Sequence, residues 1–166
     1  MGLKRTQFAR GTRSKVRRIK VKGKTKTPTI YVKSTVCWFA STLTWTVPIR
    51  LKSPNALVHY RTQGKINDKI GRELMVHMPK EIKHVTLPCQ ITFTRIAPRR
   101  LDSDNNTFAF KYCRDYLCGH LRPGLRAGRA DTEEFFKFEY SQETAGKGEY
   151  GIKISIKNLA NINDEC

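Results

Sequence analysis

The residues that could carry chemistry are concentrated between Asp102 and Asp115. Acidic residues are scarce, because the 166-residue chain has 14 Asp and Glu against 32 Lys and Arg. Asp102, Asp104 and Asp115 nevertheless fall in this one window, together with Asn105 and Lys111. Carboxylates placed together repel one another unless a cation lies between them. Mg²⁺ prefers oxygen ligands and is held by only a few carboxylates, so the window predicts a candidate Mg²⁺ site.

Periodicity predicts a helix that begins at Asn105, because Asp104 is a favoured N-cap residue. One face of this helix would carry Asp104, Phe108, Lys111 and Asp115. The opposite face looks like a core stripe: Ala109, Phe110, Cys113, Tyr116 and Leu117. A simpler interpretation stays open, in which Asp104 is only a cap. Lys111 and Asp115 would then be only an i,i+4 pair worth a few tenths of a kcal/mol.

Two strands and one helix can be placed before this window. Residues 89–96, directly before it, read as a strand. Residues 43–51 alternate between apolar and polar side chains, which predicts a strand, and Pro48 indicates an edge position because proline cannot donate to a ladder. A helix with the apolar stripe Ile66, Ile70, Leu74 and Met78 is expected to end at Pro79.

Two further strands are expected at 135–140 and 150–156, separated by a Gly-rich turn. The order β, α, β, α, β, β predicts an α+β fold, in which about two main helices pack against a small mixed β-sheet. We expect residues 43–158 to form one domain, between a basic and flexible extension (1–42) and a polar tail (159–166).

The net charge of +18 is unevenly distributed along the chain. Residues 1–33 hold 12 of the basic residues and no acid, whereas the other 20 basic residues exceed the 14 acids by six. This charge predicts a polyanionic partner, most often nucleic acid, that would bind in a salt-dependent way. A basic tail that only aids solubility is the simpler alternative.

The cysteines and the hydropathy indicate a reducing, cytoplasmic location. Five cysteines at irregular spacing support neither a disulfide framework nor a zinc site. No apolar run approaches 18 residues, so no membrane span is expected. No apolar stretch follows the basic N-terminus, so no secretory signal is expected either.

An ordered set of motifs in residues 44–157 resembles the RusA-like Holliday-junction resolvases that are common in phages and prophages. The motifs are Ser53-Pro-Asn55, His59-Tyr-Arg-Thr62, a basic helix, Thr92-Phe-Thr-Arg-Ile-Ala-Pro98, Leu101-Asp-Ser-Asp-Asn105, Lys111, Arg114-Asp115, Asp131 and Tyr140-Ser-Gln142. The most specific part is the D-x-D-N element with a lysine and R-D downstream.

The resemblance implies a homodimer that makes paired nicks in four-way DNA with Mg²⁺ or Mn²⁺. Asp102, Asp104 and Asp131 match the metal-binding acids, Lys111 matches a lysine that supports catalysis, and Asp115 would be a supporting acid. Relatives usually carry two adjacent acids at the third position. Here Ala130 precedes Asp131, with Glu133 and Glu134 after it, so Glu133 is the alternative to Asp131 as the third ligand.

Basic residues near these motifs are the candidates for contact with the DNA backbone. They are Arg99, Arg100, Arg122, Arg126 and Arg129, with Lys65 and Lys69 on the first helix. Three alternatives remain. The chain could be a junction-binding relative that does not cut, a nuclease acting on other branched DNA, or a basic RNA-binding or ribosome-associated protein.

Overall fold

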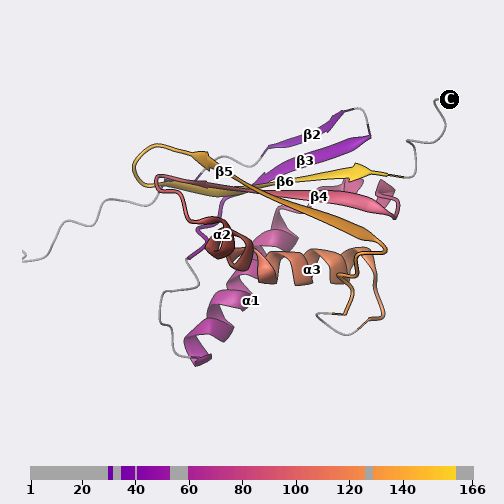
Figure 1. Ribbon diagram of the computed structural model, residues 1–166, viewed down its shortest axis with the longest axis horizontal. Helices are drawn as coiled ribbons and strands as arrows, with labels where there is room; N and C mark the ends of the chain where they lie inside the picture. Colours follow the sequence, from indigo (N-terminus) through magenta and orange to yellow (C-terminus); the bar gives the residue numbers. More distant parts are fainter. Residues whose placement is uncertain (1–29, 32–34, 40, 53–59, 126–128, 160–166) are drawn as a thin grey trace, which may run out of the picture.

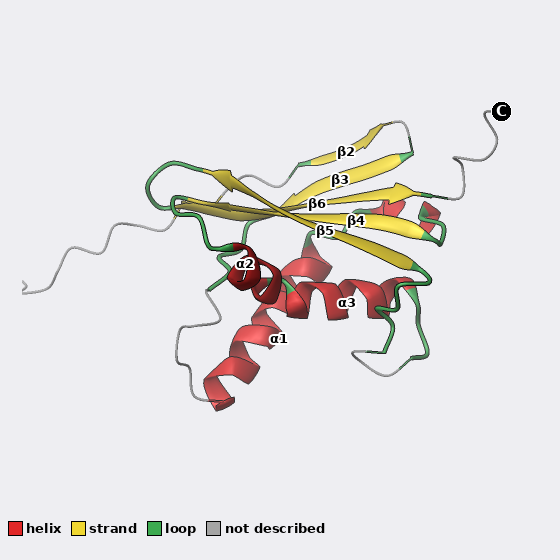
Figure 2. Cartoon of the chain, viewed as in Figure 1, coloured by secondary structure: helices red, strands yellow, loops and turns green. Residues whose placement is uncertain are grey.

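The computed structural model describes residues 30–31, 35–39, 41–52, 60–125 and 129–159, and it confirms an α+β fold (Figure 1). The elements are β1 (Ile30–Tyr31), β2 (Val36–Phe39), β3 (Thr42–Val47), α1 (Tyr60–Val76), the 3-10 helix η1 (Lys80–His84), β4 (Cys89–Ala97), α2 (Ser103–Ala109), α3 (Lys111–Leu121), β5 (Phe136–Thr144) and β6 (Glu149–Asn158). The strands form a mixed sheet in the order β2-β3-β6-β4-β5, and β1 pairs with the start of β6. The helices α1, α2 and α3 lie on one face of the sheet (Figure 2).

The core forms between that face of the sheet and the helices. Alternating residues of the central strands β4 and β6 are fully buried, among them Phe93 and Ile154. The predicted apolar stripes cover them, with Leu74 from α1 and Phe110 and Leu117 from the α2–α3 segment. Apolar residues recur at every second position in the strands and about every 3.6 positions in the helices. These two periods made the strands and helices predictable from the sequence.

The ordered sheet begins before residue 43, so the expected boundary of the N-terminal extension needs correction. β2 pairs antiparallel with β3, and β1 pairs parallel with β6. β3 is therefore flanked by both β2 and β6, and the prediction of an edge strand was wrong. Pro48 causes no break because it follows Val47, the last residue of β3.

The single helix predicted from Asn105 is two helices in the structure. Asp102, and not Asp104, is the N-cap of α2, because its side chain accepts a hydrogen bond from the Asn105 backbone N–H. α2 ends at Phe110, whose N–H bonds to carbonyls only two and three residues back. This tighter turn redirects the chain into α3 and lets the Phe110 ring pack at 5.2 Å, centroid to centroid, from the Phe93 ring.

The segment from β4 through α2 and α3 to β5 is a crossover between two parallel strands. Parallel strands end at the same edge of a sheet, so the chain leaving β4 toward Asp102 runs beside the last residues of β5. This topology places Asp102 and Gln142 together although they are far apart in the sequence.

Candidate active site

Gln142 fixes the turn that carries Asp102 and Asp104. Its side-chain amide makes two hydrogen bonds with the backbone of Leu101. The Leu101 N–H donates to Gln142 Oε1 at 2.8 Å, and Gln142 Nε2 donates to the Leu101 carbonyl at 2.8 Å. The amide thus pairs with Leu101 as a neighbouring strand would, and it ties the turn to β5.

Asp102 and Asp104 are exposed in the first turn of α2. Both carboxylate oxygens of Asp102 accept hydrogen bonds from Asn105, one from its backbone N–H at 2.9 Å and one from its side-chain amide at 2.8 Å. Asp104 accepts a long bond of 3.4 Å from the Ser103 hydroxyl. A carboxylate offers about four acceptor positions, so both residues retain free lone pairs that face solvent.

Two buried polar residues that sequence reasoning missed support this turn from beneath. Asn106 is 3% exposed, and its amide donates to the Ser141 carbonyl at 3.4 Å. Arg95 is 8% exposed, and its guanidinium donates to the Arg99 carbonyl at 2.7 Å. A signal was available for Arg95, because it continues the buried alternation of β4 at a position where an apolar residue would be expected.

A cavity of about 440 Å³ lies beside the turn. Its lining includes Arg100, Ser103, Thr107 and Gln142. Arg99 and Arg100 are exposed, and only Leu101 separates Arg100 from Asp102 in the chain. The cavity therefore offers cationic and hydroxyl groups that suit a phosphate, on residues close in the chain to Asp102 and Asp104.

Asp131 belongs to a second group of charges, centred on Arg114. The guanidinium of Arg114 contacts the Asp131 carboxylate at 2.9 Å and lies 5.3 Å from the centre of the Phe138 ring. Burial lowers the pKa of Arg114, but a hydrogen bond to the Tyr140 hydroxyl and the carboxylates of Asp131 and Asp115 outweigh this and raise it. Arg114 therefore stays cationic and neutralises Asp131.

Asp115 lies close enough to this group to be perturbed by it. Partial burial raises the pKa of Asp115, and the negative charge of Asp131 raises it further. Arg114 and Lys111 act in the opposite direction but do not cancel the effect. Lys111 itself is exposed at the first position of α3, one helical turn from Asp115.

The structure thus brings together Asp102, Asp104 and Asn105 in one place, and Arg114, Asp115 and Asp131 in another. In the described part of the chain, no three His, Cys, Asp or Glu side chains lie close enough to hold a metal ion together. Mg²⁺ is commonly bound through one or two carboxylates and keeps several waters, so a site formed by Asp102 and Asp104 stays a prediction. The shared site with Asp131 stays a prediction as well.

The remaining predicted residues have separate positions. Glu133 is exposed and lines a different cavity together with Pro88 and Leu159. Arg122 donates to the Ala130 carbonyl and the Thr132 hydroxyl and stacks on the Phe135 ring at 3.9 Å, which indicates a structural role. The exposed candidates are Arg129, Lys65 and Lys69, whereas Arg126 lies outside the described residues.

The buried cysteines offer no nucleophile. Burial raises the pKa values of the Cys89, Cys113 and Cys118 thiols to about 12. They remain protonated at neutral pH, and only a thiolate is an effective nucleophile or metal ligand.

No protein-family model matches this sequence, and no curated protein sequence matches it either. None of the helices in the described ranges is long and apolar enough to cross a bilayer.

Proposed function

We propose that the chain is a metal-dependent endonuclease that resolves four-way DNA junctions by paired nicks, in the manner of RusA-like resolvases. The observation that carries this proposal is the turn of Asp102 and Asp104, held by Gln142 and open to solvent. An ordinary N-cap needs one acid and no such anchor. The proposed enzyme acts on DNA in the cytoplasm, as a homodimer with Mg²⁺ or Mn²⁺.

Hydrolysis of a phosphodiester needs an activated water, an in-line approach and neutralised charge at phosphorus. A divalent ion bound by Asp102 and Asp104 would supply the activated water and positive charge. Asn105 holds the Asp102 carboxylate through both of its oxygens, which fixes the orientation of the remaining lone pairs. Gln142 limits the movement of the whole turn, so the two carboxylates need little reorganisation.

The basic residues would bind the phosphates of the junction. Arg100 lines the cavity next to the turn, and the exposed Arg99 precedes it in the chain, so both could hold a strand that enters the cavity. Lys111 is a compact charge on a flexible side chain, which suits contact with a phosphate without fixed bidentate geometry. A junction is distinguished by its shape, so backbone contacts of this kind would suffice for recognition.

A junction-binding relative without nuclease activity is the second candidate, and the Arg114–Asp131 ion pair favours it. Asp131 is the third acid that the resemblance assigns to the metal, yet its carboxylate is already neutralised at 2.9 Å. If the site needs three acids from one chain, this pairing removes one of them.

Cleavage of a labelled synthetic four-way junction separates the two candidates. The full chain is assayed with Mg²⁺, Mn²⁺ or EDTA, beside Asp104→Asn and the Asp102→Asn/Asp104→Asn double variant. Glu81→Gln, an exposed acid in η1, is the matched control. We expect paired, metal-dependent nicks that both Asp variants lose and the control keeps.

Binding of the same junction is measured in parallel. Asp104→Asn should bind as tightly as the wild type or more tightly, because a negative charge near the phosphates is removed. Tight binding by a wild type that never nicks would select the inactive relative. Unchanged nicking by Asp104→Asn would reject the assignment of the metal to this turn.

A further inference from the structure

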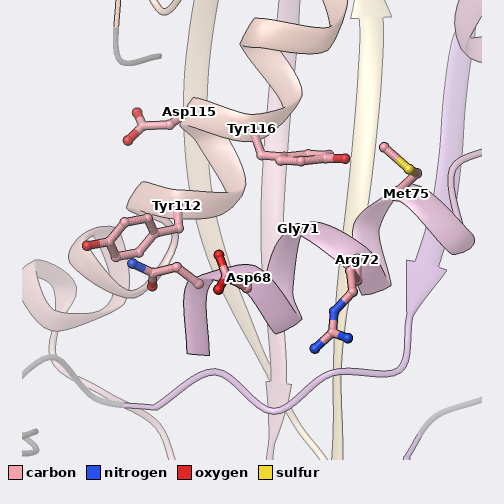
Figure 3. Close-up of a pocket in the computed structure, with 8 residues that line it drawn as sticks. Asp68, Gly71, Arg72, Met75, Tyr112, Asp115 and Tyr116 are labelled. Carbon is pink, nitrogen blue, oxygen red and sulfur yellow. The ribbon is translucent and has the colours of Figure 1, made fainter. Parts of the chain in front are cut away.

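A groove separates α1 from α3 on the side of the helical layer that faces away from the core (Figure 3). Its volume is about 570 Å³, and its lining includes Asp68, Gly71, Arg72 and Met75 from α1 and Tyr112 and Tyr116 from α3. None of the functions assigned above uses it. We name it the α1–α3 groove.

The floor of the groove is preformed. A Cβ atom on Gly71 would lie only 3.1 Å from a ring carbon of Tyr116, so glycine lets this ring lie directly on the backbone of α1. Figure 3 shows the Tyr116 ring above Gly71, with Met75 beside it. The Tyr116 ring of α3 therefore lies between the two helices here, and an apolar hollow remains beside it.

Exposed apolar side chains gather around this hollow. Met75 is 64% exposed and Tyr112 is 39% exposed, and both line the groove. These residues, one on α1 and one on α3, are two of the seven exposed large hydrophobics in the described part of the chain. Exposed apolar side chains that line one hollow indicate an interaction surface.

The charges of the groove favour a protein partner over a polyanion. Asp68 and Asp115 line it with a single cation, Arg72. In a chain of net charge +18, this is a surface with more acid than base. DNA phosphates would meet two carboxylates here, so nucleic acid is a poor occupant.

We propose that the α1–α3 groove is the surface through which two copies of this chain associate about a two-fold axis. In a two-fold interface, each contact is made twice by the same pair of residues. Asp68 and Arg72 are one helical turn apart on α1 and both are exposed. When two α1 helices cross antiparallel, Asp68 of each copy faces Arg72 of the other, so the pair is self-complementary. Within the described residues, neither side chain has an ion-pair partner.

This inference rests on the homodimer of the proposed function, and it names the surface that the resemblance leaves open. It does not rest on cleavage. A dimer that cuts no junction would reject the proposed function and keep the inference, whereas a monomer that cuts junctions would reject the inference alone.

The first test measures the mass of the full chain by sedimentation velocity over a range of concentrations in about 150 mM salt. We expect a dimer for the wild type and a dissociation constant at least about tenfold higher for Met75→Glu and Tyr112→Glu, since each places a charge in a desolvated contact. Val36→Glu adds the same charge at an exposed apolar residue of β2 and should change nothing. Circular dichroism confirms that each variant is folded.

The second test exchanges the charges. Asp68→Arg and Arg72→Asp should each weaken the dimer, because each sets like charges against one another across the axis. The double variant Asp68→Arg/Arg72→Asp should restore it. A wild type that is monomeric throughout, or a dimer that no groove variant weakens, would overturn the inference. Groove variants that keep the wild-type dimer but lose junction affinity would instead assign the groove to nucleic acid.

Discussion

Gln142 shows how a single side chain can position a candidate active site. Its two hydrogen bonds reach across 41 residues of sequence to Leu101, the residue before Asp102. They satisfy the backbone N–H and the backbone carbonyl of Leu101, which lies in a turn and is not paired with a strand. The resemblance includes this glutamine in its Tyr-x-Gln element, and the structure gives a physical reason for it.

We predict that Gln142→Ala lowers the free energy of unfolding by about 1–3 kcal/mol, because it leaves the Leu101 N–H and carbonyl without their partner. Gln90→Ala is the control, since the Gln90 side chain forms no hydrogen bond within the described residues. Urea denaturation of both variants measures the difference. Equal losses in the two variants would contradict the anchoring role of Gln142.

Asp115 gives a prediction about pH. Its pKa is raised above 3.8 mainly by burial, so the folded protein binds a proton at this carboxyl more readily than the unfolded chain does. Stability therefore falls as pH rises from about 3.8 through the raised pKa. Asp115→Asn, which cannot ionise, should raise Tm at pH 7, and its advantage should shrink as pH falls toward 4. A lower Tm at pH 7, or a difference independent of pH, would refute this.

For single residues, the sequence identified the acidic side chains of the candidate site but not the residues that they contact. Spacing brought Asp102, Asp104 and Asp115 to attention, since they are close in the chain. It could not show that Asp131 pairs with Arg114, 17 residues earlier, or that Asn106 is buried against Ser141. Such contacts depend on how the β4–α2–α3–β5 crossover folds, and periodicity carries no information about that.

Among the helices and strands, α2 carries a residue with both a structural role and a proposed catalytic role. Asp102 begins this helix and also supplies a candidate metal ligand, so its replacement affects both roles. The two roles can be separated because serine is a good N-cap residue but a poor ligand for Mg²⁺.

We predict that Asp102→Ala costs about 0.5–2 kcal/mol of stability through loss of the cap, whereas Asp102→Ser costs less. Both variants should lose junction cleavage. Thermal unfolding and cleavage are measured on the same preparations. Cleavage that returns with Asp102→Ser would mean that Asp102 acts only as a cap.

The main elements were predictable because their apolar residues recur with clear periods. The break at Phe110 was not, since Ala109, Phe110 and Cys113 fit one continuous helix equally well. The break follows from the fit of the Phe110 ring against Phe93 and Tyr140 in the finished core. β1 and η1 are too short to show a period, and β2 lies within residues 1–42, which were expected to form a flexible extension.

The whole molecule separates its surfaces by charge. The exposed Arg99 and Arg100 precede the exposed carboxylates of α2 in the chain, while the α1–α3 groove carries more acid than base. The proposed DNA binding and the proposed dimer would both depend on this division, since the net charge of the chain is +18. The same cations that attract phosphate would otherwise hold the two copies apart.

This division predicts how junction binding depends on salt. We expect the affinity to fall steeply between low and moderate salt, because each bound phosphate releases counterions. Arg99→Ala/Arg100→Ala should lower the slope of log K against log salt by about 2, which is close to one unit per lost phosphate contact.

Lys80→Ala/Lys83→Ala removes the same charge from η1 and serves as the matched control. Those lysines precede the first residue of β4, whereas the two arginines follow its last residue, so the variants probe opposite ends of one strand. The control should keep the wild-type slope. If both double variants lower the slope equally, the DNA is held by diffuse charge rather than at the turn of Asp102 and Asp104.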